Sequence, residues 1–306
     1  MKAGLKILVI SLIAECSLFL FSGCSTKTNQ ISQNPSPMVD YIRPHHRVDG
    51  SNCEGSRFEL NNVFDQPVNI FISNHISSSD TVDIIIHFHG GSKATEWVGC
   101  NQEKKVVIAT VNLGSGSSKY EKPLLNQERA INLFDKIENM LKKEYELNIG
   151  STTITGFSAG YGAIRALLSN PETYEKIDGV ILMDGLHTDY IPDKRLLSDG
   201  GMINSDKLDS FLKLAKDAIE GNKSFIFTHS SIFPGTYAST TECADYLINA
   251  LDLKRRSDLK QGPLGMQQLG STEVRGLKIL AFAGNTAPDH VDHLHGLSFF
   301  YKLLME

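Results

Sequence analysis

Apolar and polar residues follow one another along residues 56–306 in blocks that predict strands separated by helices. Unbroken apolar runs at 83–89 (DIIIHFH), 105–112 (KVVIATVN) and 277–284 (LKILAFAG) are typical of strands buried on both faces. Residues 124–145 and 205–222 instead carry apolar side chains at helical spacing. Further strands are predicted at 151–157, 177–185 and 223–229, further helices at 159–169, 239–251 and 296–305, and an antiparallel strand pair at 57–62 and 68–73. Strands linked by helices pair in parallel, so we expect an α/β fold with one mostly parallel, doubly wound sheet and helices on both faces.

The first 24 residues have the pattern of a signal peptide. Lys2 and Lys6 precede an apolar run at 7–21, which is too short for a comfortable transmembrane helix. Ser22 and Gly23 then lead into Cys24, and a small pair before cysteine resembles the lipobox of bacterial lipoproteins. The resemblance implies cleavage after residue 23 and acylation of Cys24, which would hold an exported protein on a lipid membrane. Simple secretion and an uncleaved anchor stay open.

Residues 24–52 are expected to form a flexible tether, because residues 25–47 are polar and contain three prolines. Residues 53–306 then form the globular domain. In an exported protein cysteines can pair, and Cys53 and Cys100 both lie in loop-like sequence near the start of that domain. We therefore predict a disulfide between them and a buried Cys243.

Composition narrows the classes of function. Of the 306 residues, 41% are hydrophobic and 21% charged, and the net charge is -5. The Lys and Arg residues are scattered rather than clustered in a stripe, so nucleic acid is not an expected partner. A small molecule is the expected partner instead.

Residues 156–160, Gly-Phe-Ser-Ala-Gly, form the pattern G-x-S-x-G around Ser158. A β-branched run precedes this pentapeptide and a helix-like run follows it, as a nucleophile on a tight strand-to-helix turn requires. The alternative is an ordinary serine at a helix N-cap. Together with His89-Gly90-Gly91 after an earlier strand, the turn resembles the α/β-hydrolase superfamily of serine esterases and lipases. The resemblance implies an oxyanion hole formed by the N–H groups of Ala159 and of Gly91 or Ser92.

The same resemblance implies an acid and a base that complete a catalytic triad. The usual place for the acid offers only Glu242, which also fits a helix capping box, so we favour Asp184 at the end of the preceding strand. His290 and His293 follow the last strand on a predicted loop, and either is a candidate base, with His290 preferred. A metal site built from this histidine- and aspartate-rich loop is a rival interpretation, although neither a metal nor a cofactor is expected.

The sequence therefore predicts a serine hydrolase that cleaves a carboxylic ester through an acyl-enzyme. A serine peptidase or amidase, or an acyltransferase of the same fold, is the first alternative. A surface lipoprotein that binds a ligand without catalysis is an alternative of another class. The loop at 230–239 follows a strand and is expected to offer Phe233 and Tyr237 to a substrate pocket.

Overall fold

The structure is a computed structural model, and it describes residue 48 and residues 52–304. The predicted signal peptide, the acylation site Cys24 and nearly all of the predicted tether lie outside these residues. None of the helices within the described residues is long and apolar enough to cross a membrane.

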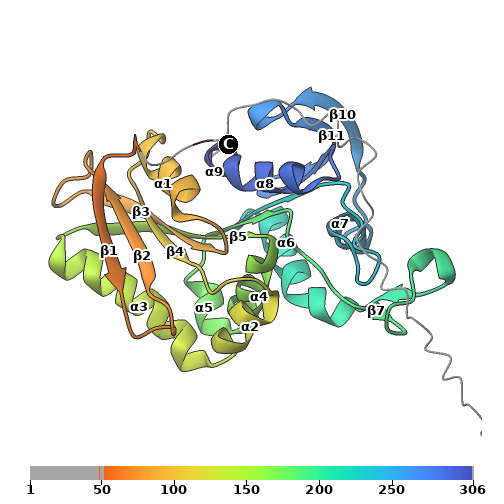
Figure 1. Ribbon diagram of the computed structural model, residues 1–306, viewed down its shortest axis with the longest axis horizontal. Helices are drawn as coiled ribbons and strands as arrows, with labels where there is room; N and C mark the ends of the chain where they lie inside the picture. The colour runs from red at the N-terminus through yellow and green to blue at the C-terminus, as the bar shows by residue number, and fades with distance from the viewer. Residues whose placement is uncertain (1–47, 49–51, 305–306) are drawn as a thin grey trace, which may run out of the picture. The chain divides into compact units, whose positions relative to one another are not determined.

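A ten-stranded sheet forms the centre of the described domain (Figure 1). In the order in which they neighbour one another, its strands are β1 (Gly55–Leu60), β2 (Val68–Ser73), β4 (Val106–Val111), β3 (Thr81–Phe88), β5 (Asn148–Phe157), β6 (Gly179–Met183), β9 (Ser224–His229), β12 (Leu277–Phe282), β11 (Gln267–Val274) and β10 (Arg256–Gln261). The strands from β4 to β12 are parallel, and the pairs at both ends of the sheet are antiparallel. The predicted parallel sheet with an antiparallel start is confirmed.

The parallel strands are in register, so that their carboxyl ends meet at one edge. Gly156 on β5 pairs with Phe88 on β3 and with Leu182 on β6. Thr228 on β9 pairs with Met183 on β6. The segments that follow these strands therefore start side by side, which is where α/β sheets place their ligands.

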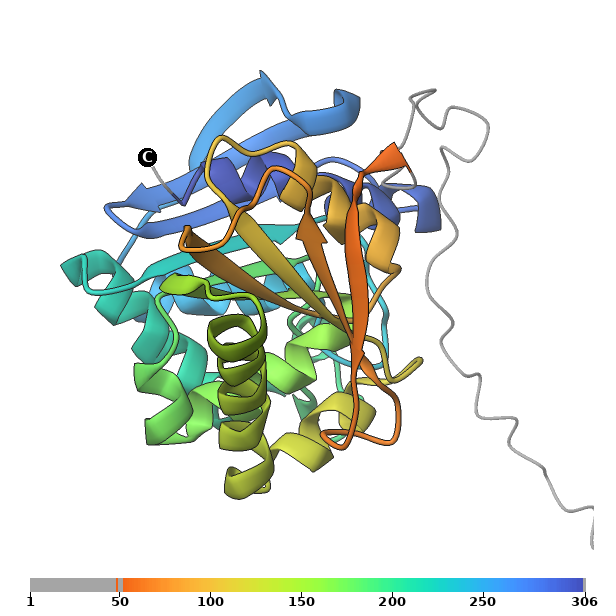
Figure 2. The ribbon, with the colours of Figure 1, turned by 90° about the vertical axis from the view of Figure 1, so that its left-hand side faces the viewer.

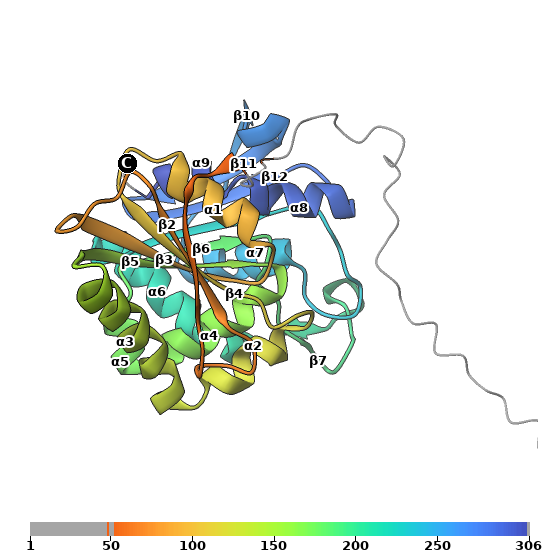
Figure 3. The ribbon, with the colours of Figure 1, turned by 60° about the vertical axis from the view of Figure 1, so that its left-hand side comes forward.

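Helices cover both faces of the sheet, as Figures 2 and 3 show from two directions. One face carries α1 (Ser92–Cys100), α8 (Ala287–His295) and α9 (Leu297–Lys302). The other carries α2 (Ser117–Leu124), α3 (Gln127–Glu144), α4 (Tyr161–Ser169), α5 (Pro171–Glu175), α6 (Asp209–Glu220) and α7 (Thr240–Ala250). Each face buries its own apolar cluster, so the sheet is buried on both sides.

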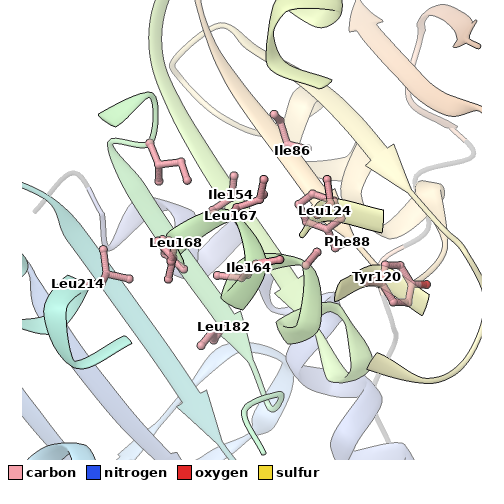
Figure 4. Packing of buried hydrophobic residues seen from close by; sticks show 14 of the residues in the cluster. Ile86, Phe88, Tyr120, Leu124, Ile154, Ile164, Leu167, Leu168, Leu182 and Leu214 are labelled. Atoms are coloured by element: carbon pink, nitrogen blue, oxygen red, sulfur yellow. The ribbon is translucent and has the colours of Figure 1, made fainter. Parts of the chain in front are cut away.

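Helix α4 packs against the centre of the sheet (Figure 4). Its residues Ile164 and Leu167 are fully buried, and they lie over Ile86, Ile154 and Leu182 of three neighbouring strands. Burying a side chain of this size contributes about 1.5–3 kcal/mol to folding. This packing fixes the helix that follows the turn carrying the candidate nucleophile, Ser158.

Several parts of the fold differ from the prediction, which also did not include the short helices α1, α2 and α5. The edge strand β10 and its partner β11 were not predicted, because β10 is mostly exposed and has almost no apolar residues to signal a strand. The predicted loop at 285–295 is wrong, because α8 occupies it. Thr286 and Asp289 form a capping box at its start, which supplies acceptors for the first N–H groups of the helix.

The predicted disulfide is also wrong, because Cys53 and Cys100 are both free thiols. The thiol of Cys53 donates to the carbonyl oxygen of Glu96 at 3.6 Å, and the Cys100 Sγ lies 3.9 Å from Ser73 Oγ. Burial, together with a hydrogen bond to Cys100, raises the pKa of Cys53 to about 12. The reactive thiolate is therefore disfavoured at this site. Cys243 is buried in α7, as predicted.

Leu167→Ala tests the packing of α4. The fully buried side chain leaves a cavity when truncated, so we expect the free energy of unfolding to fall by about 2–5 kcal/mol. Urea denaturation followed by circular dichroism measures this change. Leu259 on the edge strand β10 is 77% exposed, and Leu259→Ala serves as the matched control. Equal losses in the two variants would contradict the packing described here.

Candidate active site

Ser158 lies at the corner between β5 and the helical segment that leads into α4. It begins the short 3-10 helix η3 (Ser158–Gly160), and its backbone has a φ of 47°. Residues other than glycine rarely adopt positive φ, and such strain is concentrated at functional sites. The side chain is partly exposed and lines two cavities. The tight strand-to-helix turn predicted from the pentapeptide is therefore present.

Two glycines let neighbouring strand ends approach this turn. A Cβ on Gly160 would lie 2.1 Å from the carbonyl oxygen of Phe88, the last residue of β3. A Cβ on Gly185, which follows β6, would lie 2.3 Å from the carbonyl oxygen of Ser158. Any side chain at either position would push the strand end away. The glycines thus hold the ends of β3, β5 and β6 together around Ser158.

Asp184 follows β6 directly and is 2% exposed, with a φ of 44°. Its Oδ1 accepts hydrogen bonds from Ser230 N at 2.8 Å and from Thr240 Oγ1 at 2.9 Å. Its Oδ2 accepts from Ser230 Oγ at 2.7 Å and from His290 Nδ1 at 2.7 Å. Four donors satisfy the buried carboxylate and fix its orientation.

The pKa of Asp184 is strongly lowered. Burial alone would raise it, but the charges of His293 and His290 and the hydrogen bonds from His290 and the Ser230 N–H outweigh burial. The carboxylate is therefore ionised at neutral pH. It can stabilise positive charge on an imidazole beside it.

His290 lies on α8 and connects Asp184 to the cavity that Ser158 lines. Its Nδ1–H donates to the carboxylate, so that in the neutral ring the lone pair is on Nε2. The ring packs against Phe157, with centroids 4.5 Å apart, and this residue immediately precedes Ser158. Ser158, Asp184 and His290 line one cavity of about 200 Å³, which we call the small cavity. An acyl group bound there would meet both the serine and the imidazole.

The other two candidates lie in different surroundings. His293 is 1% exposed, its Nδ1 is 2.7 Å from Thr228 Oγ1, and its ring packs edge-to-face on Phe282. Glu242 forms the capping box of α7 with Ser239 and accepts from the hydroxyl of Tyr190. Neither residue lines the small cavity. His290 and Asp184 thus line the same cavity as Ser158, whereas His293 lies close enough to Asp184 to lower its pKa but does not line that cavity.

The residues expected to stabilise an oxyanion lie at helix N-termini. Ala159 is in the first turn after β5, and Gly91 is the N-cap of α1, immediately before Ser92. N–H groups in a first helical turn have no acceptor within their own helix. Because Gly160 touches the end of β3, the loop at 89–91 begins beside the turn that carries Ala159.

His89 supports this loop rather than facing Asp184. Its backbone has a φ of 69°, and its Nδ1 is 2.9 Å from the hydroxyl of Tyr120. That hydroxyl also donates to the carbonyl oxygen of Gly114 at 2.8 Å. Burial lowers the pKa of His89, and the nearby charge of His290 lowers it further. A neutral His89 thus ties the loop after β3 to the loop after β4.

A second cavity adjoins Ser158, with a volume of about 550 Å³, and we call it the large cavity. Ser158, His187 and Tyr237 line both cavities. Tyr237 thus lies where the sequence predicted, whereas Phe233 lines neither cavity. Among residues 52–304, no three His, Cys, Asp or Glu side chains are grouped so that they could hold a metal ion.

Sequence reasoning missed the residues that hold Asp184. Ser230 follows β9 directly, at the same sheet edge as Asp184, and this position was the available signal. Thr240 could not be identified from the sequence, because a threonine next to the N-cap of α7 is accounted for by helix capping alone.

The mostly parallel sheet and the strained serine turn after β5 define an α/β-hydrolase fold. At its strand ends, Ser158, Asp184 and His290 line one cavity, and His290 is hydrogen-bonded to Asp184. No protein-family model matches the chain, and no curated protein matches it.

Solved structures resemble the chain at low identity. An acetyl xylan esterase from Aspergillus awamori is 12% identical, with 79% of this chain and 99% of the esterase covered and a TM-score of 0.43. An esterase from Pseudomonas putida ECU1011 is 12% identical, with 85% of this chain and 86% of the esterase covered and a TM-score of 0.45. An acylaminoacyl peptidase of Pyrococcus horikoshii is 16% identical, with 83% of this chain and 41% of the peptidase covered and a TM-score of 0.43.

Asp184→Asn tests the ionised carboxylate through stability. Because folding lowers the pKa of Asp184 below about 3.9, its value in an unfolded chain, ionisation stabilises the fold above that pH. The stabilisation is lost as the pH falls toward the folded pKa. We therefore expect wild type to lose free energy of unfolding relative to Asp184→Asn between pH 5 and pH 3, measured by urea denaturation.

The exposed Asp206 provides the control, and Asp206→Asn should follow the wild-type pH dependence. A difference between wild type and Asp184→Asn that stays constant down to pH 3 would contradict the lowered pKa.

Proposed function

We propose that this protein is a serine hydrolase that cleaves carboxylic esters through an acyl-enzyme. The observation that carries the proposal is the 2.7 Å hydrogen bond from His290 Nδ1 to Asp184, in a cavity that His290 shares with Ser158. This bond leaves Nε2 as the basic nitrogen of a neutral ring that is held in one orientation. The positive φ of Ser158 adds support, because strain at a serine between strand and helix is a feature of nucleophiles.

In the proposed first step, Ser158 Oγ attacks the ester carbonyl and its proton passes to His290 Nε2. The negative charge that develops on the carbonyl oxygen is stabilised by the N–H groups of Ala159 and Gly91. The tetrahedral intermediate collapses, the alcohol leaves with the proton from His290, and the acyl group remains on Ser158. Water then attacks the acyl carbon and gives a proton to Nε2, which passes it to Ser158 Oγ as the bond to the serine breaks and the acid is released.

Asp184 has the role of a positioning and charge-stabilising group in this scheme. It holds the Nδ1–H tautomer of His290 and stabilises the imidazolium formed in each step. Ser230 and Thr240 keep its carboxylate in place.

Ser158→Ala tests the nucleophile. We expect kcat for p-nitrophenyl acetate to fall by about 10⁶-fold, as for loss of a serine nucleophile elsewhere, while the circular dichroism spectrum stays unchanged. A fluorophosphonate should label wild type and not this variant. Ser257 on β10 is exposed, so Ser257→Ala is the control that keeps full activity. Equal turnover by wild type and Ser158→Ala would refute the assignment.

Two pairs of variants test the acid and the base. We expect Asp184→Asn to lower kcat by about 10⁴-fold, because it disfavours the required tautomer of the imidazole. Glu242→Gln should retain activity, since Glu242 caps α7. His290→Gln should lose activity far more than His293→Gln in the same assay. If Glu242→Gln loses its activity instead, Glu242 is the acid. If His293→Gln loses more activity than His290→Gln, His293 is the base.

We also propose that the protein is exported and anchored to a membrane through acylated Cys24. The proposal rests on the pattern of residues 1–24 alone. After expression of the full chain in a bacterium, mass spectrometry should find a mature N-terminus at Cys24 that carries acyl chains. Cys24→Ala should abolish acylation, and an unmodified Met1 N-terminus in the wild-type chain would overturn the proposal.

A further inference from the structure

The large cavity beside Ser158 has charged walls. Glu121 and Arg165 form a two-pronged ion pair, with Nε 2.8 Å from Oε1 and Nη2 2.7 Å from Oε2. The Arg165 side chain is 11% exposed, so most of this pair is sheltered from water. Asp189 and Lys207 form a second ion pair at the mouth, where their side chains are 55% and 42% exposed. Because the charges cancel within each pair, the cavity favours neither a net anion nor a net cation.

Aromatic rings and hydroxyl groups form the rest of the lining. The ring of His187 packs edge-on against Tyr161, at 5.5 Å between centroids, and against Tyr237, at 4.9 Å. Burial lowers the pKa of His187, and its Nδ1–H donates to the carbonyl oxygen of Ala238. Ser117, Ser118 and Thr188 add hydroxyl groups. Among the described residues that line this cavity, Ala159 has the only aliphatic side chain.

These walls do not suit a fatty chain. An alkyl group in this cavity would take water from the two ion pairs without offering them hydrogen bonds in return. A compound with many hydroxyl groups, by contrast, offers donors to the carboxylates and acceptors to Arg165, and hydrogen bonds to charged groups are the stronger ones. The aromatic rings supply the apolar faces on which the C–H groups of a sugar ring can pack.

The small cavity differs in size and in the kind of apolar residue that lines it. Its volume of about 200 Å³ is below the roughly 300 Å³ at which pockets begin to hold drug-sized ligands. Ile232, Pro234 and Ala287 give it an apolar part. Such a space accepts a short acyl group and excludes a long one. Because the two cavities share the lining residue Ser158, one ester can occupy both.

We infer, building on the ester hydrolysis proposed above, that the substrate is a short-chain acyl ester of an uncharged, polyhydroxylated alcohol such as a sugar. The acyl group occupies the small cavity, where it is transferred to Ser158 in the first step and is released as the acid in the second. The alcohol occupies the large cavity, whose exposed mouth at Asp189 and Lys207 gives it a path to solvent after acylation.

A set of esters tests this inference. We expect kcat/KM for 6-O-acetyl methyl glucoside to exceed that for hexyl acetate by about 10- to 100-fold, since the sugar makes hydrogen bonds to charged groups that hexanol cannot make. p-Nitrophenyl acetate should be cleaved faster than p-nitrophenyl octanoate. Equal values for the two acetates, faster cleavage of the octanoate, or preference for the methyl ester of glucuronic acid over both acetates would overturn the inference.

A double variant tests the charged wall directly. Glu121→Leu/Arg165→Leu replaces the sheltered ion pair by apolar side chains, and it should lower the preference for the sugar acetate over hexyl acetate by at least about 10-fold. The control is Glu138→Leu/Lys142→Leu, which removes a surface ion pair of α3 with a separation of 2.9 Å. An unchanged preference in the Glu121/Arg165 variant, with the control also unchanged, would refute the role of this wall.

Binding separates the inference from the proposed reaction. Saturation-transfer NMR on the full chain carrying Ser158→Ala compares methyl glucoside with hexanol and requires no turnover. Stronger binding of methyl glucoside, weakened by Glu121→Leu/Arg165→Leu, supports the polar alcohol site even if no ester is cleaved. Stronger binding of hexanol overturns the inference even if Ser158 proves to be the nucleophile.

Discussion

The hydrogen bond between His290 and Asp184 is the interaction on which the proposed chemistry depends. It joins residues 106 positions apart in the sequence, one on α8 and one after β6. The carboxylate can be buried and ionised because Ser230, Thr240 and His290 together satisfy its oxygens. Without these donors, burial would raise its pKa, and the carboxyl would no longer stabilise an imidazolium.

The sheet brings Asp184 and His290 within hydrogen-bonding distance. Parallel strands in register bring the residues after β5, β6 and β9 to one edge, and α8 crosses that edge after β12. Positive φ at both Ser158 and Asp184 concentrates backbone strain at this edge. The packed core beneath α4 and the close approaches at Gly160 and Gly185 hold that strained geometry.

The same edge combines a larger cavity with charged and aromatic walls and a smaller one that has aliphatic residues in its lining. Ser158 lines both cavities, so the proposed nucleophile faces two different environments. An alkyl group would remove water from the sheltered Glu121–Arg165 ion pair, which costs free energy. Under the proposed function, the walls of this cavity therefore affect which class of substrate binds as well as how tightly it binds.

The sequence by itself determined the order of parallel strands and helices, the tight turn at Ser158 and the capping box of α7, because periodicity and caps are local signals. The sequence did not decide whether Asp184 or Glu242 is the candidate acid, or whether His290 or His293 is the candidate base. Both choices depend on contacts between segments that are distant in the sequence. Tertiary structure decided that Asp184 meets His290, that α8 replaces a loop, and that Cys53 and Cys100 remain thiols. It alone brought Arg165 and Glu121 to the cavity that Tyr237 lines. These outcomes follow from how strand ends and helices pack together, and no local pattern along the chain encodes that packing.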